Sequence, residues 1–444
     1  MTPCRRFCPE RTIELDPFTA GLVLICFLAL LGLPIGLSMI TGSILYLWMR
    51  GQDMGLVAER LLNSMFTGYV ILAVPLFILA AELMNSGSMT DRLLRFCNAF
   101  VGRFRGGLAQ VNIVQSVIFS GMSGSAFADA AGTGRIIANM MTRNGLYTRS
   151  FAAALTASSA VIGPIIPPSI PMVLYALVSN ASIGFLFLAG ILPGLLMALM
   201  LMTLVVVQSR RLNFPVETPV PIRELPGITL GAFPALLMPV VLLGGIYSGA
   251  MTPTEAAAVA AAYALLVSSL LYRSISLGQL YRALTSGARS SASIGMLIAG
   301  ALVFNYVVTA ENIPQKLSIY LTGWDLTPLQ FLLLVNVVLL LIGALLEGTA
   351  ILLIIVPVFI PTATALGIDP VHFGVVAVVN IMIGLITPPY GLLIFIMQSI
   401  TGAPLRHLIR DLIPFIIALL VALMIITVFP DFVLWLPRQF GYQG

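Results

Sequence analysis

The sequence has few charged residues. Asp, Glu, Lys and Arg make up 9% of its 444 residues, whereas soluble domains carry about 25%. Hydrophobic residues make up 59%, and apolar runs long enough to cross a roughly 30 Å hydrocarbon core recur along the chain. These runs do not alternate apolar and polar residues as the strands of a membrane barrel do. The composition excludes a soluble globular domain and predicts an all-α polytopic membrane protein.

Lysine, histidine and cysteine are nearly absent. Lys316 is the single lysine, and the net charge of +5 comes from scattered arginines, which excludes a nucleic-acid-binding surface. The four cysteines show no metal-ligand spacing, and no G-x-x-x-x-G-K-[ST] phosphate-binding loop occurs. We therefore expect no transition-metal centre and no ATP site. Residues 1–17 lack the order of a cleavable signal peptide, so the apolar run from Phe18 is expected to be the first span.

Two pairs of apolar runs are each separated by small or polar residues. Ser123-Gly124-Ser125 separates one pair, and Glu347-Gly348-Thr349 separates the other. The four runs are 107–121, 126–142, 328–346 and 350–366. Each run is too short to span a bilayer alone. Each pair therefore predicts a re-entrant hairpin, in which two helices meet in a turn at membrane depth.

Two longer runs contain adjacent prolines. Pro167-Pro168 lies in the run 150–178, and Pro388-Pro389 lies in the run 371–398. Proline removes a backbone donor and clashes with the preceding helical turn. Two adjacent prolines are expected to unwind the helix and free its carbonyl groups, which predicts two broken transmembrane helices.

These features recur in the same order in both halves of the chain. The step from SGSA at 123–126 to EGTA at 347–350 is nearly the same as the step from the first Pro-Pro pair to the second. The recurrence predicts a repeat in which each half has three helices, a hairpin, a broken helix and a final helix. This alignment places Glu347 at the position of Ser123.

The distribution of basic residues predicts opposite orientations for the two halves. With the N-terminus outside, the inside segments hold 14 arginines and the outside segments hold seven basic residues, as the positive-inside rule requires. Arginines flank both ends of the first hairpin, whereas the base of the second carries Asp325 and Asp369. We expect an inverted structural repeat with both termini outside.

Non-helical backbone at membrane depth must be buried in protein or line a cavity. Transporters with broken helices bind Na⁺ at unwound carbonyls and anions at half-helix N-termini, and hydroxyl and carbonyl oxygens suit a hard cation. The first candidate Na⁺ site comprises Ser123, Gly124, Ser125, Gly163 and Pro167. The second comprises Gly348, Thr349, Gly384, Thr387 and Pro388. Close helix packing through small residues is the structural alternative.

Candidate substrate-binding residues lie beside these motifs. They are Ser125, Asp129, Arg135, Thr349, Pro168 and Pro389. An ionisable residue at membrane depth, such as Asp129, indicates function by default. Asp129 either helps to hold a cation or pairs with Arg135, and Arg135 either binds the substrate carboxylate or neutralises Asp129. Glu347 could tune the second ion site or sense protons.

Four motifs in order across residues 18–435 carry a family resemblance. SGSAFADAAGTG, IGPIIPPS, LLEGTAILLIIVPVFIP and GLITPPYGLLIFI resemble the large membrane subunit, of the DctM type, of tripartite ATP-independent periplasmic (TRAP) transporters. The family belongs to a wider ion-transporter superfamily with an elevator-like fold. The resemblance implies Na⁺-driven uptake of a small carboxylate, such as a C4-dicarboxylate or sialic acid, across a bacterial inner membrane.

The resemblance also implies partners besides membrane lipid: a small four-helix membrane subunit of the DctQ type, and a periplasmic substrate-binding protein of the DctP type. It implies that the hairpins and broken helices form a moving transport domain. The expected parts are an extension (1–17), scaffold and arm (18–106), hairpin and broken helix (107–183), scaffold and arm (184–327), hairpin and broken helix (328–404), and a final scaffold helix (405–444). The arms are the amphipathic stretches 88–106 and 312–324.

Other functions fit parts of the sequence. A binding-protein-independent Na⁺/dicarboxylate carrier or a Na⁺/H⁺ antiporter of the same superfamily would share the architecture. Gly121-Met122-Ser123-Gly124 matches the G-x-S-G of an intramembrane serine protease. Such a protease needs a base within hydrogen-bond reach. His372 is expected at an external hairpin base and His407 in an inside loop, so we expect a transporter and not an enzyme.

Overall fold

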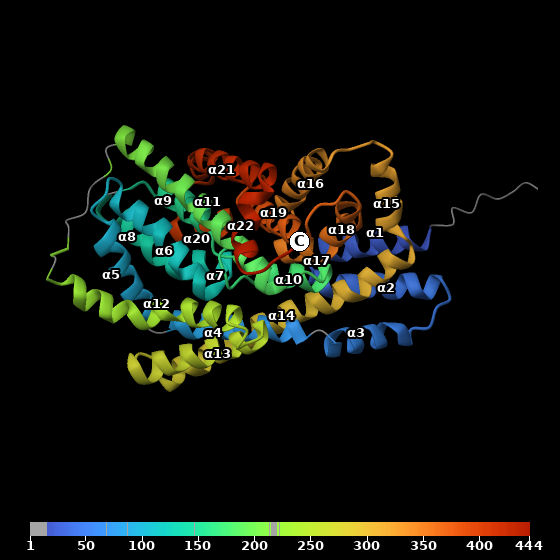
Figure 1. The fold of residues 1–444 in the computed structure, drawn as a ribbon, viewed down its shortest axis with the longest axis horizontal. Coiled ribbons are helices and arrows are strands. Elements are labelled where there is room, and N and C mark those ends of the chain that lie inside the picture. The colour runs from blue at the N-terminus through green and yellow to red at the C-terminus, as the bar shows by residue number, and fades with distance from the viewer. Residues whose placement is uncertain are drawn as a thin grey trace, which may run out of the picture. The chain divides into compact units, whose positions relative to one another are not determined.

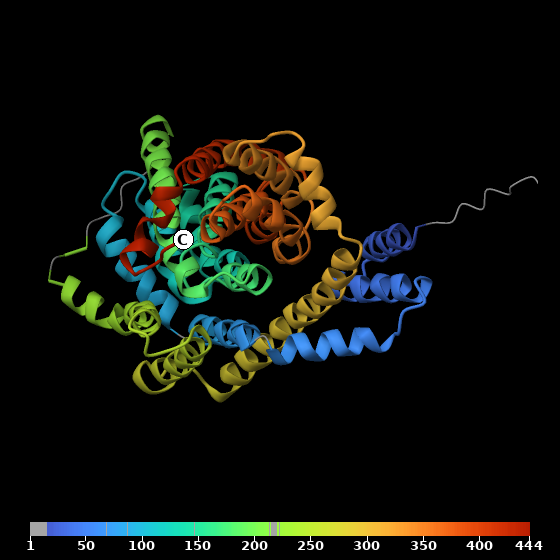
Figure 2. The same cartoon turned by 45° about the vertical axis from the view of Figure 1, so that its right-hand side comes forward.

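The computed structural model describes residues 16–67, 69–86, 88–145, 147–212, 214, 220, 221 and 223–444. Most of the N-terminal extension, with Cys4 and Cys8, lies outside these ranges. The elements within them are all helices (Figures 1 and 2). The chain falls into two units. Unit 1 comprises the residues up to Met65 together with Met296–Asn312, and unit 2 comprises Phe66–Gly295 and Ile313–Gly444.

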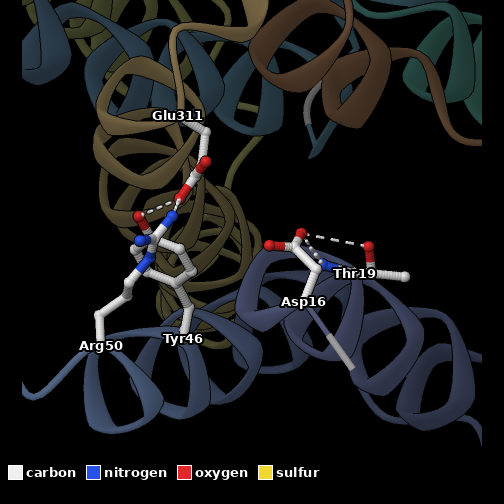
Figure 3. A network of polar contacts seen from close by, with 5 residues as sticks. All are labelled: Asp16, Thr19, Tyr46, Arg50 and Glu311. Atoms are coloured by element: carbon white, nitrogen blue, oxygen red, sulfur yellow. Dashed lines mark hydrogen bonds and ion pairs between the residues drawn. The ribbon is translucent and has the colours of Figure 1, made fainter. Parts of the chain in front are cut away.

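Unit 1 contains α1 (Pro17–Leu30), α2 (Ile35–Met49), most of α3 (Gly55–Thr67) and the end of α14 (Leu277–Ala310). Asp16 caps α1, because its carboxylate accepts from the backbone N–H of Thr19. Figure 3 shows how α2 is joined to α14: Arg50 forms an ion pair with Glu311, and the Tyr46 hydroxyl donates to the same carboxylate at 2.7 Å. The hydrogen bond and charge of the Glu311 carboxylate raise the pKa of Arg50 above its usual value.

In unit 2 the chain continues through the remaining numbered helices, as follows. The first part comprises α4 (Ala73–Ser86), α5 (Met89–Val101), α6 (Gly107–Ser123), α7 (Ala126–Asp129), α8 (Arg135–Thr142), α9 (Arg149–Ala160), α10 (Ile170–Ser179), α11 (Ile183–Leu212), α12 (Leu225–Tyr247) and α13 (Pro253–Leu266). After α14 come α15 (Ile313–Thr322), α16 (Pro328–Gly343), α17 (Gly348–Ile354), α18 (Val356–Ala365), α19 (Pro370–Gly384), α20 (Leu392–Thr401), α21 (Leu405–Val428) and α22 (Pro430–Gln439).

Several helices are long and apolar enough to cross a membrane. Five such segments lie in the described part of the chain: Ile183–Arg211, Leu225–Tyr247, Pro253–Leu271, Leu277–Ala310 and Leu405–Val428. The pair α17 and α18 is bent by 49° and makes a sixth candidate. These helices make the chain a multi-pass membrane protein.

The chain leaves the helical conformation at all four places where small residues or prolines predicted a break. Helix α6 ends at Ser123 before α7, and α16 ends at Gly343 before α17. Helix α9 ends at Ala160 before α10, and α19 ends at Gly384 before α20. Both Pro-Pro peptide bonds are cis.

The two interrupted helices run in opposite directions. Tyr175, near the end of α10, donates its hydroxyl to the carbonyl of Pro370 at the start of α19, at 2.6 Å. Arg149, at the start of α9, lies against Gly402 just beyond α20. The start of each interrupted helix therefore lies beside the end of the other.

Some helices depart from the predicted runs. A π-helical turn, Ala130–Gly134, separates α7 from α8 within the run predicted over 126–142. Helix α3 corresponds to no predicted run, because its mixed polar and apolar residues give no apolar stretch of membrane length. The single final scaffold helix expected within 405–444 is divided at Phe429, where α21 ends and α22 begins.

Candidate functional site

The first small-residue motif packs backbone to backbone against the first Pro-Pro break. Gly124 has a φ of +57°, and a Cβ there would lie 2.3 Å from the carbonyl oxygen of Pro168. A Cβ on Gly163 would lie 3.6 Å from the carbonyl oxygen of Ser125. The structure thus brings the two parts of the first candidate ion site together. Only glycine permits this approach at position 124, because φ is positive and no space is left.

Ser123, the last residue of α6, carries a buried hydroxyl. Its Oγ has no hydrogen-bond partner among the described residues. Buried hydroxyls in proteins almost always have a partner. The oxygen is therefore available as a ligand for a hard cation.

The second motif is organised around Glu347. Its carboxylate accepts from the backbone N–H of Ala350 at 3.2 Å and from the hydroxyl of Thr349. Gly348 packs against Ile381 of α19, and Gly384 packs against Gly343, whose Cα would lie 2.8 Å from an added Cβ. The sequence analysis did not predict a role for Gly343. Its role shows only in the structure, where the glycines at the ends of two neighbouring helices pack together.

The two remaining residues of the second candidate ion site lie in the break after α19. The Thr387 hydroxyl donates to the carbonyl of Ile383 at 2.8 Å. Pro388 is half-buried, whereas Pro389 is exposed.

The helix caps correct the predicted register of the repeat. Ser125 accepts from the N–H of Ala128 and Glu347 from that of Ala350, so both residues are N-caps. An N-cap acceptor fixes where a helix starts. Glu347 therefore shares the role of Ser125, and its predicted alignment with Ser123 is wrong by two positions. Pairing the two caps also brings the spacing of the motifs closer to the spacing of the two Pro-Pro pairs.

A cavity of about 460 Å³ in unit 2 is lined by both motifs. Its wall includes Ser123, Gly124, Ser125, Glu347, Gly348 and Thr349. Glu82 and Asn85 of α4 and Ser290 and Ser293 of α14 also line it. No Lys, Arg or His is among the described lining residues. Helices α7, α10 and α17 begin at this cavity, and α10 and α17 lie side by side (Figure 1).

The other candidate residues do not line this cavity. Gly163, Pro167, Pro168, Gly384, Thr387, Pro388 and Pro389 are not among its lining residues. Asp129 is buried; the Thr133 hydroxyl donates to its Oδ1 at 2.6 Å. Arg135 is exposed and forms no ion pair with Asp129. Of the substrate candidates, Ser125 and Thr349 line the cavity.

Buried asparagines tie α6 to α9 and α16 to α19. Asn112 of α6 donates to the Thr156 hydroxyl of α9 at 2.7 Å, and the Ser159 hydroxyl donates to Asn112 at 2.9 Å. In the second half, Asn380 of α19 donates to the Asn336 side chain at 2.8 Å. These buried polar residues are therefore explained by the hydrogen bonds that they form between helices.

We expect Asn380→Ala to destabilise the protein by about 1–3 kcal/mol, because it leaves the buried Asn336 side chain with one partner fewer. A fall in the thermal unfolding midpoint of the detergent-purified protein measures this. Ser399→Ala is the control, because the Ser399 hydroxyl is exposed and donates to the carbonyl of Ile396 within its own helix. Equal midpoints for both variants would contradict a structural role for Asn380.

The histidines do not form a catalytic pair with Ser123. His372 is buried, and its Nε2 lies 2.9 Å from the carbonyl oxygen of Ile426. His407 lies in α21 and not in the predicted loop. Neither lines the cavity, and the described residues include no cluster of three or more His, Cys, Asp or Glu that could hold a metal.

Residues 22–432 match the family described as "Tripartite ATP-independent periplasmic transporter, DctM component". The chain belongs to this family. It is 40% identical to the sialic acid TRAP transporter large permease protein SiaM of Vibrio cholerae, over 93% of the chain and 96% of SiaM. It is 43% identical to the C4-dicarboxylate TRAP transporter large permease protein DctM of Pseudomonas aeruginosa, over 84% of the chain and 87% of that protein.

The fold is also similar to a solved transporter structure. The YdaH transporter of Alcanivorax borkumensis superposes with a TM-score of 0.63 at 17% identity, over 94% of this chain and 99% of YdaH. The SiaM and DctM relatives of this DctM-family chain are named as transporter permease proteins. The chain is therefore a transporter subunit and not a protease.

Proposed function

We propose that this DctM-family chain is the large permease subunit of a TRAP system that imports a small organic acid with Na⁺. The observation that carries the proposal is the cavity lined by both small-residue motifs. The described wall has no basic side chain. A bound carboxylate there needs other positive charge, which helix N-termini and bound cations supply in transporters of this type.

The first proposed Na⁺ site follows the backbone contacts of Gly124 and Gly163, and the second is its counterpart in the other half. Ser123, Gly124 and Ser125, with the chain at Gly163 and Pro167, offer carbonyl and hydroxyl oxygens in the first half. Gly348 and Thr349, with Gly384, Thr387 and Pro388, offer them in the second. The unpartnered Ser123 hydroxyl supports the first site. These ions would organise the two motifs and offset the charge of the anion between them.

The opposed directions of the interrupted helices support an inverted repeat. The start of α9 lies beside the end of α20, and the start of α19 lies beside the end of α10. The end that carries Arg149 would face the cytoplasm and the end that carries Asp369 the periplasm, in keeping with the positive-inside rule. Both termini would then be periplasmic, with the chain in the inner membrane. The hairpins and broken helices would move as an elevator against the other helices.

Membership of the family supports two partners, a small membrane subunit and a periplasmic binding protein. The binding protein would deliver the substrate. The named substrates of the relatives, sialic acid and C4-dicarboxylates, are the candidates to test first. A carrier that works without a binding protein would take up the substrate without it, and a Na⁺/H⁺ antiporter would take up no substrate at all.

We expect substrate accumulation in proteoliposomes only when both membrane subunits, the binding protein and an inward Na⁺ gradient are present. Radiolabelled sialic acid and succinate, each with its binding protein, are the substrates. An inward K⁺ gradient is the control for ionic strength. Uptake without the binding protein would overturn the tripartite assignment. Uptake of equal rate in K⁺ would overturn Na⁺ coupling.

A further inference from the structure

Eight exposed arginines gather at one end of unit 2. They are Arg103 and Arg105 after α5, Arg143 and Arg149 around the turn between α8 and α9, Arg210 and Arg211 at the end of α11, and Arg406 and Arg410 in the first turns of α21. We call them the arginine belt. They come from four separate parts of the sequence, so the fold brings them together.

Packing contacts join the segments that carry the belt. Gly106, next to Arg105, packs against Ser209, next to Arg210: an added Cβ would lie 3.5 Å from the Ser209 Cβ. The Phe214 ring lies 4.7 Å from that of Phe151, which is 5.8 Å from the Phe415 ring of α21. Arg149 lies against Gly402.

The belt is not neutralised by the described part of the protein. The ion pairs among the described residues are Arg50–Glu311 and Arg438–Asp431, and none involves the belt. The acidic residues on the same segments are Asp91, at the opposite end of α5, and Asp411, next to Arg410. Two acids cannot balance eight guanidinium groups, so this end attracts anions.

Exposed aromatic rings lie beside the arginines after α5. Phe100 and Phe104 are 44% and 52% exposed, and the Arg103 guanidinium lies 5.5 Å from the Phe104 ring centre. Alternating arginine and aromatic side chains are typical of the boundary between hydrocarbon and lipid headgroups. A water-soluble anion has no acyl chain for these rings to contact.

We propose that Arg103 and Arg105, together with Arg210 and Arg211, bind the phosphate of an anionic phospholipid headgroup. One guanidinium group can donate two parallel hydrogen bonds to the oxygens of a phosphate. Basic clusters at the ends of membrane helices bind anionic lipid headgroups on the cytoplasmic side. Phe100 and Phe104 would contact the acyl chains. The bound lipid holds the end of α5 at the membrane surface, beside the helix that leads to the first small-residue motif.

The test measures lipid binding without substrate or transport. The purified protein in a neutral detergent is titrated with dioleoyl phosphatidylglycerol or dioleoyl phosphatidylethanolamine, and bound lipid is counted by native mass spectrometry. Wild-type protein should retain phosphatidylglycerol and not phosphatidylethanolamine. R103Q/R105Q/R210Q/R211Q should lower the apparent affinity for phosphatidylglycerol at least about tenfold. K316Q/R438Q, which removes exposed cations elsewhere, should leave it unchanged.

Three outcomes would overturn the proposal. They are equal retention of phosphatidylglycerol by wild-type and quadruple variant, equal retention of both lipids by wild-type protein, and displacement of phosphatidylglycerol by millimolar inorganic phosphate, which would indicate a site for the free anion. Because the four arginines are exposed, the quadruple variant should keep the wild-type unfolding midpoint. If the quadruple variant does not fold, the pair variants R103Q/R105Q and R210Q/R211Q replace it in the test. Each should then show an intermediate loss of affinity for phosphatidylglycerol.

Discussion

Gly124→Ala should reduce Na⁺-dependent uptake at least about tenfold, because binding groups must be held within about 0.5 Å of their productive positions. The new Cβ would lie 2.3 Å from the carbonyl oxygen of Pro168. The motif and the Pro-Pro break would have to separate to relieve this contact. Initial uptake rates in proteoliposomes, at equal amounts of reconstituted protein, measure the loss.

Gly249→Ala is the matched control for Gly124→Ala. Gly249 also has a positive φ, +73°, but no atom lies within 4 Å of an added Cβ. Both variants carry the backbone cost of alanine in the left-handed region, about 1–2 kcal/mol, so the difference between them isolates the approach to Pro168. Equal uptake by the two variants would mean that the contact between residues 124 and 168 has no part in transport.

Ser123→Ala should raise the Na⁺ concentration for half-maximal uptake at least about tenfold, since a contact to a charged group contributes about 1.5–3 kcal/mol and about 1.4 kcal/mol corresponds to tenfold. The folded protein should lose no stability. The Ser123 hydroxyl has no described hydrogen-bond partner, so its removal breaks no bond. This combination, a lower apparent affinity for Na⁺ at an unchanged unfolding midpoint, distinguishes an ion ligand from a packing residue.

Ser120→Ala provides the comparison for Ser123→Ala. Ser120 is buried one turn earlier on α6, and its hydroxyl donates to the carbonyl of Val117 at 2.5 Å. The Na⁺ dependence of this variant should match that of the wild type. A Ser123→Ala protein with wild-type Na⁺ dependence would remove this hydroxyl from the ion site.

The four helix breaks could be predicted because their causes are local. Proline lacks the backbone N–H that a helix needs. A short motif of small and polar residues between two apolar runs indicates a turn at membrane depth, which must be buried in protein or line a cavity. Pro167-Pro168 and Pro388-Pro389 accordingly lie between helices. The register of the second motif could not be predicted from letters alone, because the capping side chain and not the sequence similarity decides where α17 begins.

Contacts between segments that are distant in the sequence could not be predicted from it. Gly343 and Gly384 lie on different helices and show their relation only where α16 crosses α19. Glu82, Asn85, Ser290 and Ser293 line the same cavity as the two motifs, although nothing in their own segments points to it. Their helices were predicted as scaffold, and only packing brings their polar side chains to that wall.

Direct binding of ²²Na⁺ to the purified chain, without substrate or partners, tests the central claim most closely. The account predicts saturable binding that excess Na⁺ displaces and excess K⁺ does not. It also predicts weaker binding in Ser123→Ala and Gly124→Ala than in Ser120→Ala and Gly249→Ala. No saturable ²²Na⁺ binding by a folded wild-type protein, or equal binding by all four variants, would contradict it.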